Sequence, residues 1–275
     1  MTVDHMHPKF KRLLLTGAGG GIGQAIRAPI AAFAENLRLS DLAGALPTQA
    51  QAHEEVVACD LADKAAMDSL IAGCDAVIHM GGVSVERPFE QVLEANIKGV
   101  FNLYEGARRH GVKRVIFASS NHVTGFYRQD QKIDTLAPRR PDSYYGLSKS
   151  FGEDTAQFYF DRYGIETASV RIGSAFPAPV DRRMMASWLS YADLVEVIRC
   201  GLFAPDLGHT VVFGASDNKA TWWDNRHAER LGFQPRDTSE VFRAEVEAQP
   251  MPAPNDPVAV LQGGKFTAMG PFETL

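Results

Sequence analysis

Short apolar segments recur along the chain, separated by intervals long enough for a helix. They are rich in aliphatic residues, and their apolar positions are continuous, as in strands that are buried on both faces. They cover residues 11–17, 36–41, 54–60, 74–80, 113–120, 166–173 and 209–216. Intervening segments carry apolar residues at helical spacing, namely Ile22–Phe33, Phe89–His110, Tyr144–Tyr163 and Tyr191–Phe203. This alternation predicts an α/β fold with a doubly wound sheet of about seven parallel strands.

Composition and charge favour a compact protein that acts on small molecules. Hydrophobic residues make up 45% of the 275 residues and charged residues 22%, which is ordinary for a globular protein. The formal net charge of −5 comes without a dense run of lysine or arginine. We therefore expect no nucleic-acid partner and no membrane partner, because both need a concentrated positive surface.

Cysteine usage and the N-terminal sequence favour the cytoplasm. Cys59, Cys74 and Cys200 form no CxxC pair, so we interpret them as buried small residues and predict neither a disulfide nor a metal site. The first ten residues lack the apolar core of a signal peptide, and no apolar run approaches the length of a membrane span. We expect a protein of a reducing compartment.

A glycine-rich turn follows the first predicted strand. Gly17, Gly20 and Gly23 lie between that strand and the first predicted helix. Glycine permits the tight turn, a close approach of the backbone to a pyrophosphate and close packing of helix on strand. The helix N-terminus adds free N–H groups for phosphates, so we also assign Gly21 and Ile22 to a dinucleotide site.

An acid at the end of the second strand indicates which dinucleotide binds. Asp41 lies 18 residues after Gly23, where a carboxylate can accept hydrogen bonds from both hydroxyls of the adenosine ribose and would repel a 2′-phosphate. The pattern predicts NAD and not NADP. The alternative for the glycine turn is a flavodoxin-like or nucleoside-binding loop.

Later strand ends supply further candidate cofactor contacts. Asp60 and Leu61 follow the third strand and are placed to meet the adenine, although Asp60 could instead cap the next helix. Gly81 follows the fourth strand and Ile172 ends the sixth. Ligands of open α/β sheets bind at this carboxyl edge.

A tyrosine and a lysine on one predicted helix are the candidates for proton transfer. Tyr145 and Lys149 are four residues apart and share a helix face. Alone they would be an ordinary surface pair, but Ser120 ends the fifth strand and places its hydroxyl at the same sheet edge. An adjacent ammonium and a positive nicotinamide ring both favour the phenolate of Tyr145, which can then accept a hydroxyl proton.

With these motifs, the sequence resembles the short-chain dehydrogenase/reductase superfamily of extended type. The matches are TGxxGxxG from Thr16, the serine after the fifth strand and YxxxK from Tyr145, and they span nearly the whole chain. The resemblance implies a Rossmann fold and NAD-dependent hydride transfer, with Tyr145 as base assisted by Lys149 and Ser120. It also implies that Asn96 supports the active-site lysine through backbone and water.

The resemblance further implies a homo-oligomer, at least a dimer, whose interface is formed by the helices Phe89–His110 and Tyr144–Tyr163. We expect an NAD-binding Rossmann domain over residues 11–172 and a small C-terminal substrate-binding and packing region, integrated with it, over residues 173–275. The last 27 residues look irregular and begin with a proline-rich stretch. We expect them to pack against the body or a neighbouring subunit through Val258, Val260, Leu261, Phe266 and Phe272.

Longer stretches are similar to the uronate dehydrogenase family of that superfamily. They read GGVSVERPFEQ, FASSNHVTGFY, YYGLSKSFGE, VRIGS and GASDNKATWWDN. This family oxidises the anomeric carbon of galacturonate or glucuronate, in the pyranose form, to an aldarolactone with NAD+. The short C-terminal region agrees with a substrate smaller than a nucleotide sugar.

The same resemblance implies a set of substrate-binding residues at the sheet edge. Arg183 would bind the uronate carboxylate through two hydrogen bonds, with Arg182 as the rival. Hydrogen bonds to the sugar or its carboxylate would come from Ser84, Ser120, Asn121, His122 and Ser174. The alternatives are a helix cap for Ser84, turn formation for Asn121 and His122, and a satisfied loop hydroxyl for Ser174.

Two further expectations concern ring side chains. His122 is not expected to act as a base, because Tyr145 has that role and the sequence shows no evident carboxylate partner for His122. Trp222 and Trp223 are expected to pack in the core or at a subunit contact, in preference to stacking on a sugar.

Two rival functions remain open at this point. A nucleotide-sugar epimerase or dehydratase would use the same tyrosine and lysine while keeping its NAD bound, but the short C-terminal region opposes it. A non-catalytic NAD-sensing protein would commonly lack one of the two residues, and both are present. The preference between galacturonate and glucuronate, the number of subunits and the fate of the lactone are not determined by the sequence.

Overall fold

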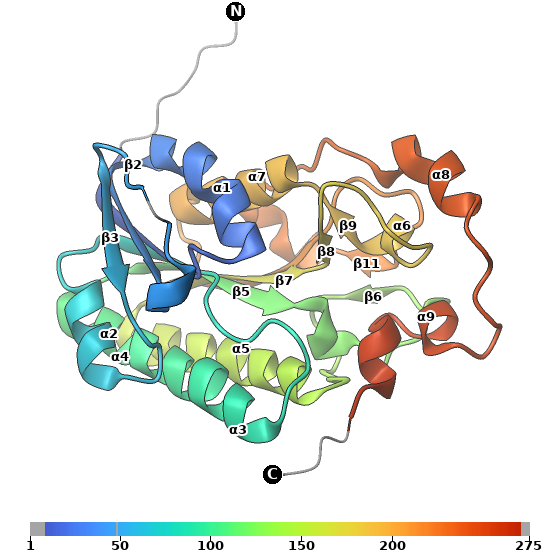
Figure 1. Cartoon of the computed structure of the whole chain (residues 1–275), viewed down its shortest axis with the longest axis horizontal. Coiled ribbons are helices and arrows are strands. Elements are labelled where there is room, and N and C mark those ends of the chain that lie inside the picture. Colours follow the sequence, from blue (N-terminus) through green and yellow to red (C-terminus); the bar gives the residue numbers. More distant parts are fainter. Residues whose placement is uncertain (1–8, 48, 271–275) are drawn as a thin grey trace, which may run out of the picture.

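A parallel sheet forms the centre of the computed structural model, which describes residues 9–47 and 49–270 (Figure 1). Its strands are β1 (Phe10–Thr16), β2 (Ala34–Asp41), β3 (Glu54–Ala58), β4 (Ala76–His79), β5 (Arg114–Ser120), β7 (Glu166–Ile172) and β10 (His209–Gly214). The strand order is β10-β7-β5-β4-β1-β2-β3, and every neighbouring pair is parallel. The predicted doubly wound sheet of seven parallel strands is therefore confirmed.

Helices cover both faces of the sheet (Figure 1). On one face lie α1 (Gly21–Ile30) and α7 (Tyr191–Phe203), and on the other lie α2 (Lys64–Ile71), α4 (Gly99–His110) and α5 (Tyr144–Tyr163). Side chains of successive residues in β1 point to opposite faces of the sheet, since Leu13 and Leu15 belong to the first core and Leu14 to the second. Because both faces are buried, the apolar positions along the strand are consecutive.

The predicted helix Phe89–His110 is divided into three segments. It begins as α3 (Phe89–Val92), widens into a π-helix over Leu93–Lys98 and continues as α4. Apolar spacing does not distinguish these segments, because a single wider turn barely changes which residues face the core. Short π-helical turns are frequent at functional sites, and this one carries Asn96.

The C-terminal part of the chain joins the central sheet and adds small elements beside it. In this part β11 (Trp223–Asp224) pairs with β6 (Ile133–Asp134) of the preceding part, and β8 (Ser174–Ala175) pairs with β9 (Trp188–Leu189). Its short helices are α6 (Met184–Ser187), α8 (Arg243–Glu247) and α9 (Pro257–Val260). Since β10 and α7 also belong to this part, it shares the core of the first 172 residues. The boundary at residue 172 remains a prediction.

Trp222 and Trp223 belong to a third, smaller core beside β10. Trp223 stacks on Phe213 with ring centroids 5.0 Å apart, and both tryptophans are buried. Burial against protein side chains agrees with the packing role that was expected of them.

The irregular C-terminal stretch also packs on the body of the protein. Its buried anchor is Gln262, and Gln129 binds its carbonyls at Val258 and Leu261. Among the residues named for this packing, Phe272 lies outside the described residues.

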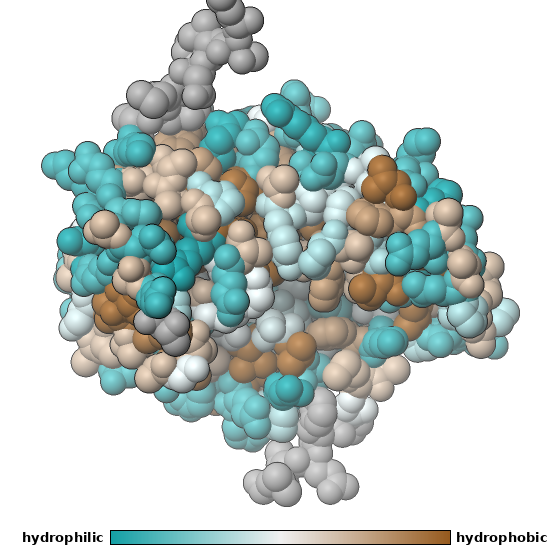
Figure 2. Space-filling view, turned by 45° about the horizontal axis from the view of Figure 1, so that its top comes forward, coloured by the Kyte–Doolittle hydropathy of each residue, from teal (hydrophilic) through white to brown (hydrophobic). Residues whose placement is uncertain are grey.

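The surface in Figure 2 mixes hydrophilic and hydrophobic residues, and the hydrophobic ones form small separate groups. Over the described ranges, no helix is long and apolar enough to cross a bilayer. The same residues contain no group of three or more His, Cys, Asp or Glu side chains placed to hold a metal ion. Cys59, Cys74 and Cys200 are free and buried.

A buried carboxylate ties α5 to the sheet. Glu153 is 0% exposed and accepts hydrogen bonds from Arg171 Nε and Nη2, both at 2.8 Å. It also accepts bonds from Ser119 Oγ at 2.6 Å and Arg139 Nε at 3.2 Å. Burial alone would raise the pKa of Glu153, but these donors lower it overall. The cluster fixes α5 against β5 and β7.

Replacing this carboxylate should destabilise the protein strongly. Glu153→Ala leaves the buried Arg171 without its ion-pair partner, which we expect to cost about 3–5 kcal/mol of the free energy of unfolding. The matched control is Asp154→Ala, because Asp154 also pairs with Arg139 but is 67% exposed, and its loss should cost less than about 1 kcal/mol. Urea denaturation measures both values, and equal losses would contradict the role given to Glu153.

Candidate active site

The carboxyl ends of the central strands border a cavity of about 480 Å³. It contains every residue that the sequence analysis named for catalysis or substrate binding: Ser84, Ser120, Asn121, His122, Tyr145, Lys149, Ser174 and Arg183. Gly21, Ile22 and Ile172, predicted to contact the cofactor, line the same cavity. The remaining predicted cofactor residues lie outside it: Asp41 ends β2, Gly23 lies in α1, and the others lie on the turns that follow β1, β3 and β4, namely Gly17, Gly20, Asp60, Leu61 and Gly81.

Close packing requires glycine at Gly17 and Gly23, the first and last glycines of the motif after β1. Gly17 has a φ of +73°, and a Cβ there would lie 2.6 Å from Gly81 N. A Cβ on Gly23 would lie 2.1 Å from Gly17 O. By contrast, a Cβ on Gly20 would meet only one atom, at 3.4 Å, and one on Gly21 would meet none within 4 Å. Gly20 and Gly21 therefore keep the outer surface of the turn clear at the N-terminus of α1.

Asp41 is fixed beside this turn by backbone hydrogen bonds. Its Oδ2 accepts from Gly19 N at 2.9 Å and its Oδ1 from Leu42 N at 2.8 Å. Each carboxylate oxygen can accept a further hydrogen bond. The carboxylate of Asp41 thus fits the adenosine ribose of NAD, and the unobstructed backbone at Gly20 and Gly21 fits its pyrophosphate.

The alternative role of Asp60 as a helix cap is wrong. The cap of α2 is Asp63, whose Oδ1 accepts from Ala65 N at 2.9 Å and Ala66 N at 3.0 Å. Asp60 Oδ1 instead accepts from Ala62 N at 2.9 Å within its own turn. The neighbouring Leu61 is held in place through its carbonyl, which accepts from Asn102 at 2.9 Å.

Tyr145 and Lys149 lie one turn apart in the first part of α5, opposite Ser120. Burial raises the pKa of Tyr145 to about 12, although a hydrogen bond with Ser120 acts in the opposite direction. Burial also lowers the pKa of Lys149 to about 8. Lys149 Nζ lies 5.5 Å from the centroid of the Tyr145 ring. In the protein alone, the expected shift of Tyr145 toward the phenolate is therefore outweighed by burial.

The N-terminus of α5 is held by a residue that the sequence analysis missed. Glu86 is buried, and its two carboxylate oxygens accept from Tyr144 N at 3.0 Å and Tyr145 N at 2.8 Å. Ser143 Oγ accepts from Gly146 N at 3.0 Å. A carboxylate at a helix N-terminus is stabilised by the helix dipole. Glu86 and Ser143 together fix the backbone that carries Tyr145.

Asn96 connects the π-helical turn to the loop after β4 and to α5. Its Oδ1 accepts from Val83 N at 2.8 Å, while its Nδ2 donates to Val83 O at 3.0 Å and Ser148 Oγ at 2.9 Å. Asn96 thus contacts the residue that precedes Lys149. Its predicted support of Lys149 through backbone and water remains a prediction.

His122 has a carboxylate partner, so the expectation that it has none is wrong. Its Nδ1 lies 2.7 Å from Asp142 Oδ2, and its ring stacks on Phe266 with centroids 3.8 Å apart. Burial lowers the pKa of His122 more than Asp142 raises it. The neutral ring therefore predominates at neutral pH, and its Nδ1–H donates to the carboxylate, which leaves Nε2 as an acceptor.

Arg183 places its guanidinium in the cavity. Its Nε donates to Gln262 O at 2.6 Å and its Nη1 contacts Ser174 Oγ at 3.4 Å. With the Asn121 amide oriented to donate to Ile172 O at 3.1 Å, the amide oxygen accepts from Arg183 Nη2 at 2.8 Å. Burial lowers the pKa of Arg183. Among the described residues this guanidinium makes no ion pair with a carboxylate.

Arg182 points elsewhere. Its Nη2 donates to the carbonyls of Glu247 at 2.6 Å and Gln249 at 3.1 Å, outside the cavity. Of the two adjacent arginines, only Arg183 faces the cavity that contains Tyr145.

The C-terminal segment closes one side of the cavity; the sequence predicted its packing on the body, but not the residues that anchor it. Gln262 is 0% exposed, and its Nε2 donates to Arg128 O at 3.0 Å and Gln131 O at 2.9 Å. Its Oε1 accepts from Trp223 Nε1 at 2.9 Å. This anchor brings four residues of the segment into the cavity wall: Val258, Gly263, Lys265 and Phe266. The only signal in the sequence was the apolar character of some of them.

Comparison with known proteins agrees with this geometry. The NAD dependent epimerase/dehydratase family matches residues 13–209. A uronate dehydrogenase from Pseudomonas putida is 64% identical over 263 residues, which are 96% of this chain and 98% of that protein. The chain belongs to the uronate dehydrogenases of this family.

Other uronate dehydrogenases match over similar lengths. That of Agrobacterium fabrum is 51% identical over 93% of this chain and 96% of its own. A crystal structure of a uronate dehydrogenase mutant from Agrobacterium tumefaciens, complexed with NAD, has a TM-score of 0.92 at 49% identity, covering 96% of this chain and 99% of that one. The family and fold predicted from the sequence are confirmed.

Removing the Gln262 anchor should loosen the wall of the cavity. Gln262→Leu leaves the Trp223 indole N–H and two backbone carbonyls without partners, at about 1–3 kcal/mol for each group that stays buried. We expect faster hydrogen exchange over residues 257–268, with slower exchange preserved in the central strands. Gln249→Leu, at an exposed position of the same segment, is the control. Unchanged exchange in Gln262→Leu would exclude an anchoring role.

Proposed function

We propose that the protein oxidises the C1 hydroxyl of galacturonate or glucuronate to the aldarolactone, with NAD+ as the oxidant. The observation that carries this proposal is a partly buried guanidinium, Arg183, without an ion-pair partner among the described residues, in the cavity that also contains Tyr145. A cation that is desolvated and fixed by neutral groups favours an anionic ligand. A uronate combines such an anion with an oxidisable hydroxyl.

The turn after β1 would hold the cofactor. The pyrophosphate would lie against Gly20, Gly21 and the N-terminus of α1, over the framework set by Gly17, Gly23 and Gly81. Asp41 would bind the adenosine ribose and select NAD. Asp60 and Leu61 would border the adenine, and Ile22, Ile172, Tyr145 and Lys149 would border the nicotinamide end. When bound, NAD+ supplies the acceptor for the hydride that leaves C1.

Arg183 would orient the substrate through its carboxylate. Two parallel hydrogen bonds from a guanidinium to a carboxylate fix both distance and direction. Asn121 and Ser174, which already contact Arg183, hold the guanidinium in the cavity. Ser84 and His122 would bind sugar hydroxyls, His122 through the acceptor that its bond to Asp142 leaves free.

Tyr145 would accept the proton of the C1 hydroxyl at its phenolate oxygen, and Ser120 would polarise the same hydroxyl. Because burial disfavours the phenolate, deprotonation needs a nearby positive charge. Lys149, whose pKa is about 8, carries that charge at neutral pH. Tyr145, Lys149 and Ser120 thus form the proposed catalytic group.

The rival functions are less well supported. Identity to uronate dehydrogenases extends along nearly the whole chain, whereas a solved UDP-galactose 4-epimerase shares the fold at 20% identity with a TM-score of 0.67. A non-catalytic NAD sensor would not need both Tyr145 and Lys149 in a cavity with Arg183.

The test follows NADH absorbance with galacturonate, glucuronate, galactose or UDP-glucose and NAD+. We expect reduction with the uronates alone, and a fall of about 10²–10⁴ in kcat for Tyr145→Phe, because the base is lost. Tyr144→Phe, at the neighbouring half-exposed position, should retain activity. Lack of activity with both uronates would overturn the proposal, and uronate oxidation by Tyr145→Phe at the normal rate would remove Tyr145 from the mechanism.

We also infer that the protein forms a homo-oligomer, at least a dimer, through the outer face of α4 and α5. Large hydrophobic side chains are exposed along it, including Leu147 at 51%, Phe158 at 48% and Phe101 at 46%. Further exposed aromatic side chains on α3 and α5 are Phe89, Tyr144 and Phe151. Several large apolar side chains exposed on neighbouring helices favour an interface.

Placing a charge on this face should dissociate the oligomer. Leu147→Glu would bury a carboxylate in an apolar contact, so we expect light scattering after size exclusion to give the monomer mass. The control is Val241→Glu, since Val241 is 76% exposed in another part of the molecule, and the oligomer mass should persist. A monomeric wild-type protein would refute the inference.

We place this reaction in the cytoplasm. The support is that all three cysteines are free and buried, as in proteins of a reducing compartment. Secretion of the active protein in cell fractionation would contradict this placement.

A further inference from the structure

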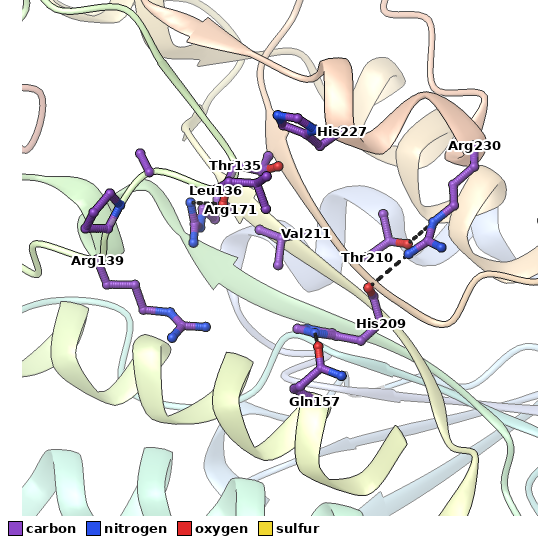
Figure 3. Close-up of a pocket in the computed structure, with 12 residues that line it drawn as sticks. Thr135, Leu136, Arg139, Gln157, Arg171, His209, Thr210, Val211, His227 and Arg230 are labelled. Carbon is purple, nitrogen blue, oxygen red and sulfur yellow. Dashed lines mark hydrogen bonds between the residues drawn. The ribbon is translucent and has the colours of Figure 1, made fainter. Parts of the chain in front are cut away.

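A second cavity, of about 400 Å³, opens beside the edge strand β10 (Figure 3). Its walls come from β7, β10, α5, residues 135–139 and the 3-10 helix Arg226–Leu231. It shares no lining residue with the active-site cavity. We call it the edge cleft and define it by Arg139, Arg171, His209, Thr210, His227 and Arg230.

The edge cleft is lined by cationic and neutral groups. Three arginines and two histidines line it, and no aspartate or glutamate does. One buried carboxylate, that of Glu153, lies behind the wall and binds both Arg171 and Arg139. Arg139 also pairs with Asp154, which is 67% exposed, so water and salt screen that pair. The charge of the arginines is therefore only partly neutralised.

Arg230 is the cation that these carboxylates leave unpaired. Its Nε donates to Thr210 Oγ1 at 3.0 Å and its Nη2 to His209 O at 3.1 Å. Both acceptors are neutral, and among the described residues Arg230 makes no ion pair. These two bonds fix the guanidinium at one end of the cleft and leave most of its five N–H donors available.

Arg139 faces Arg230 across the cleft. Figure 3 shows the two side chains on opposite sides, with Val211 and His209 between them. Arg139 uses its Nε and Nη1 for Glu153 and Asp154, which leaves its Nη2 for a ligand. Two guanidinium groups at the two ends of a cleft match a ligand that carries an anionic group at each end.

The histidines contribute polar walls. His209 binds Gln157 Oε1 through Nδ1 at 2.9 Å and Ser169 Oγ through Nε2 at 3.1 Å, and burial lowers its pKa to about 4, so the ring is neutral at neutral pH. His227 Nε2 lies 3.2 Å from Asp134 Oδ2 at the rim. Both ring nitrogens of His209 are thus engaged, and no positive charge on the two histidines is needed to balance a carboxylate of the wall, since none lines the cleft.

We propose that the edge cleft binds a small dicarboxylate, with one carboxylate at Arg230 and the other at Arg139. This site is separate from the one at which the uronate would be oxidised. Its existence does not depend on the oxidation of uronates, because binding can be measured without turnover.

The test is isothermal titration calorimetry of the full chain at constant ionic strength, with adipate and glucarate as dicarboxylates and acetate as the monocarboxylate control. We expect both dicarboxylates to bind more tightly than about 1 mM, which is well within calorimetric range, and acetate to bind at least about tenfold more weakly, because it can reach only one arginine. Arg230→Gln should weaken dicarboxylate binding at least about tenfold.

Two further variants make the result specific. Arg226→Gln lies in the same 3-10 helix, but Arg226 pairs with Asp224 outside the cleft, so binding should change less than about twofold. Arg183→Gln removes the cation of the active-site cavity, and binding at the edge cleft should persist. Lack of dicarboxylate binding by the wild type, equal binding by Arg230→Gln, or loss of binding in Arg183→Gln would each overturn the proposal.

Discussion

All strands of the central sheet run in the same direction, and the location of the chemistry follows from this constraint. Parallel strands deliver their carboxyl ends to one edge, so residues distant in sequence meet there. Thr16 at the end of β1 and His79 at the end of β4 are hydrogen-bonded at 2.7 Å, and Ser120 ends β5, three residues beyond Phe117, the partner of His79. Burial lowers the pKa of His79 to about 3, so His79 is uncharged at neutral pH. The charged side chains of the cavity, such as Lys149 and Arg183, come from helices and loops outside the sheet.

The precision of the proposed catalytic group depends on buried polar contacts of the surrounding chain. Glu86 and Ser143 hold the first turn of α5, Glu153 holds its middle, and Asn96 joins it to the loop after β4. None of these contacts is made by Tyr145 or Lys149 side chains. The helix is therefore positioned by its own backbone and by neighbouring residues, and the side chains of Tyr145 and Lys149 line the cavity.

Local sequence patterns predicted the sheet, the glycine turn, Asp41 and the Tyr145–Lys149 pair, because each depends on spacing within one or two adjacent elements. The family resemblance added Arg183 and its neighbours, and the structure places them in one cavity. The contacts that were missed join loops far apart in the chain. His122 with Asp142, Glu86 with α5, and Gln262 with Trp223 lack any periodic signature. The π-helical turn around Asn96 was not predicted either, because one wider turn barely changes the spacing of hydrophobic residues.

The contact between Arg183 and the carbonyl of Gln262 has a consequence for the order in which the site is completed during synthesis. The central sheet ends with β10, so the nucleotide-binding edge can form while the C-terminal segment is still in the ribosome. Arg183 acquires its carbonyl partner only after residue 262 has emerged from the ribosome. The nucleotide-binding edge would therefore be able to form before Arg183 is fixed in the cavity. Folding of the sheet edge and completion of the cavity around Arg183 are thus separate events in time.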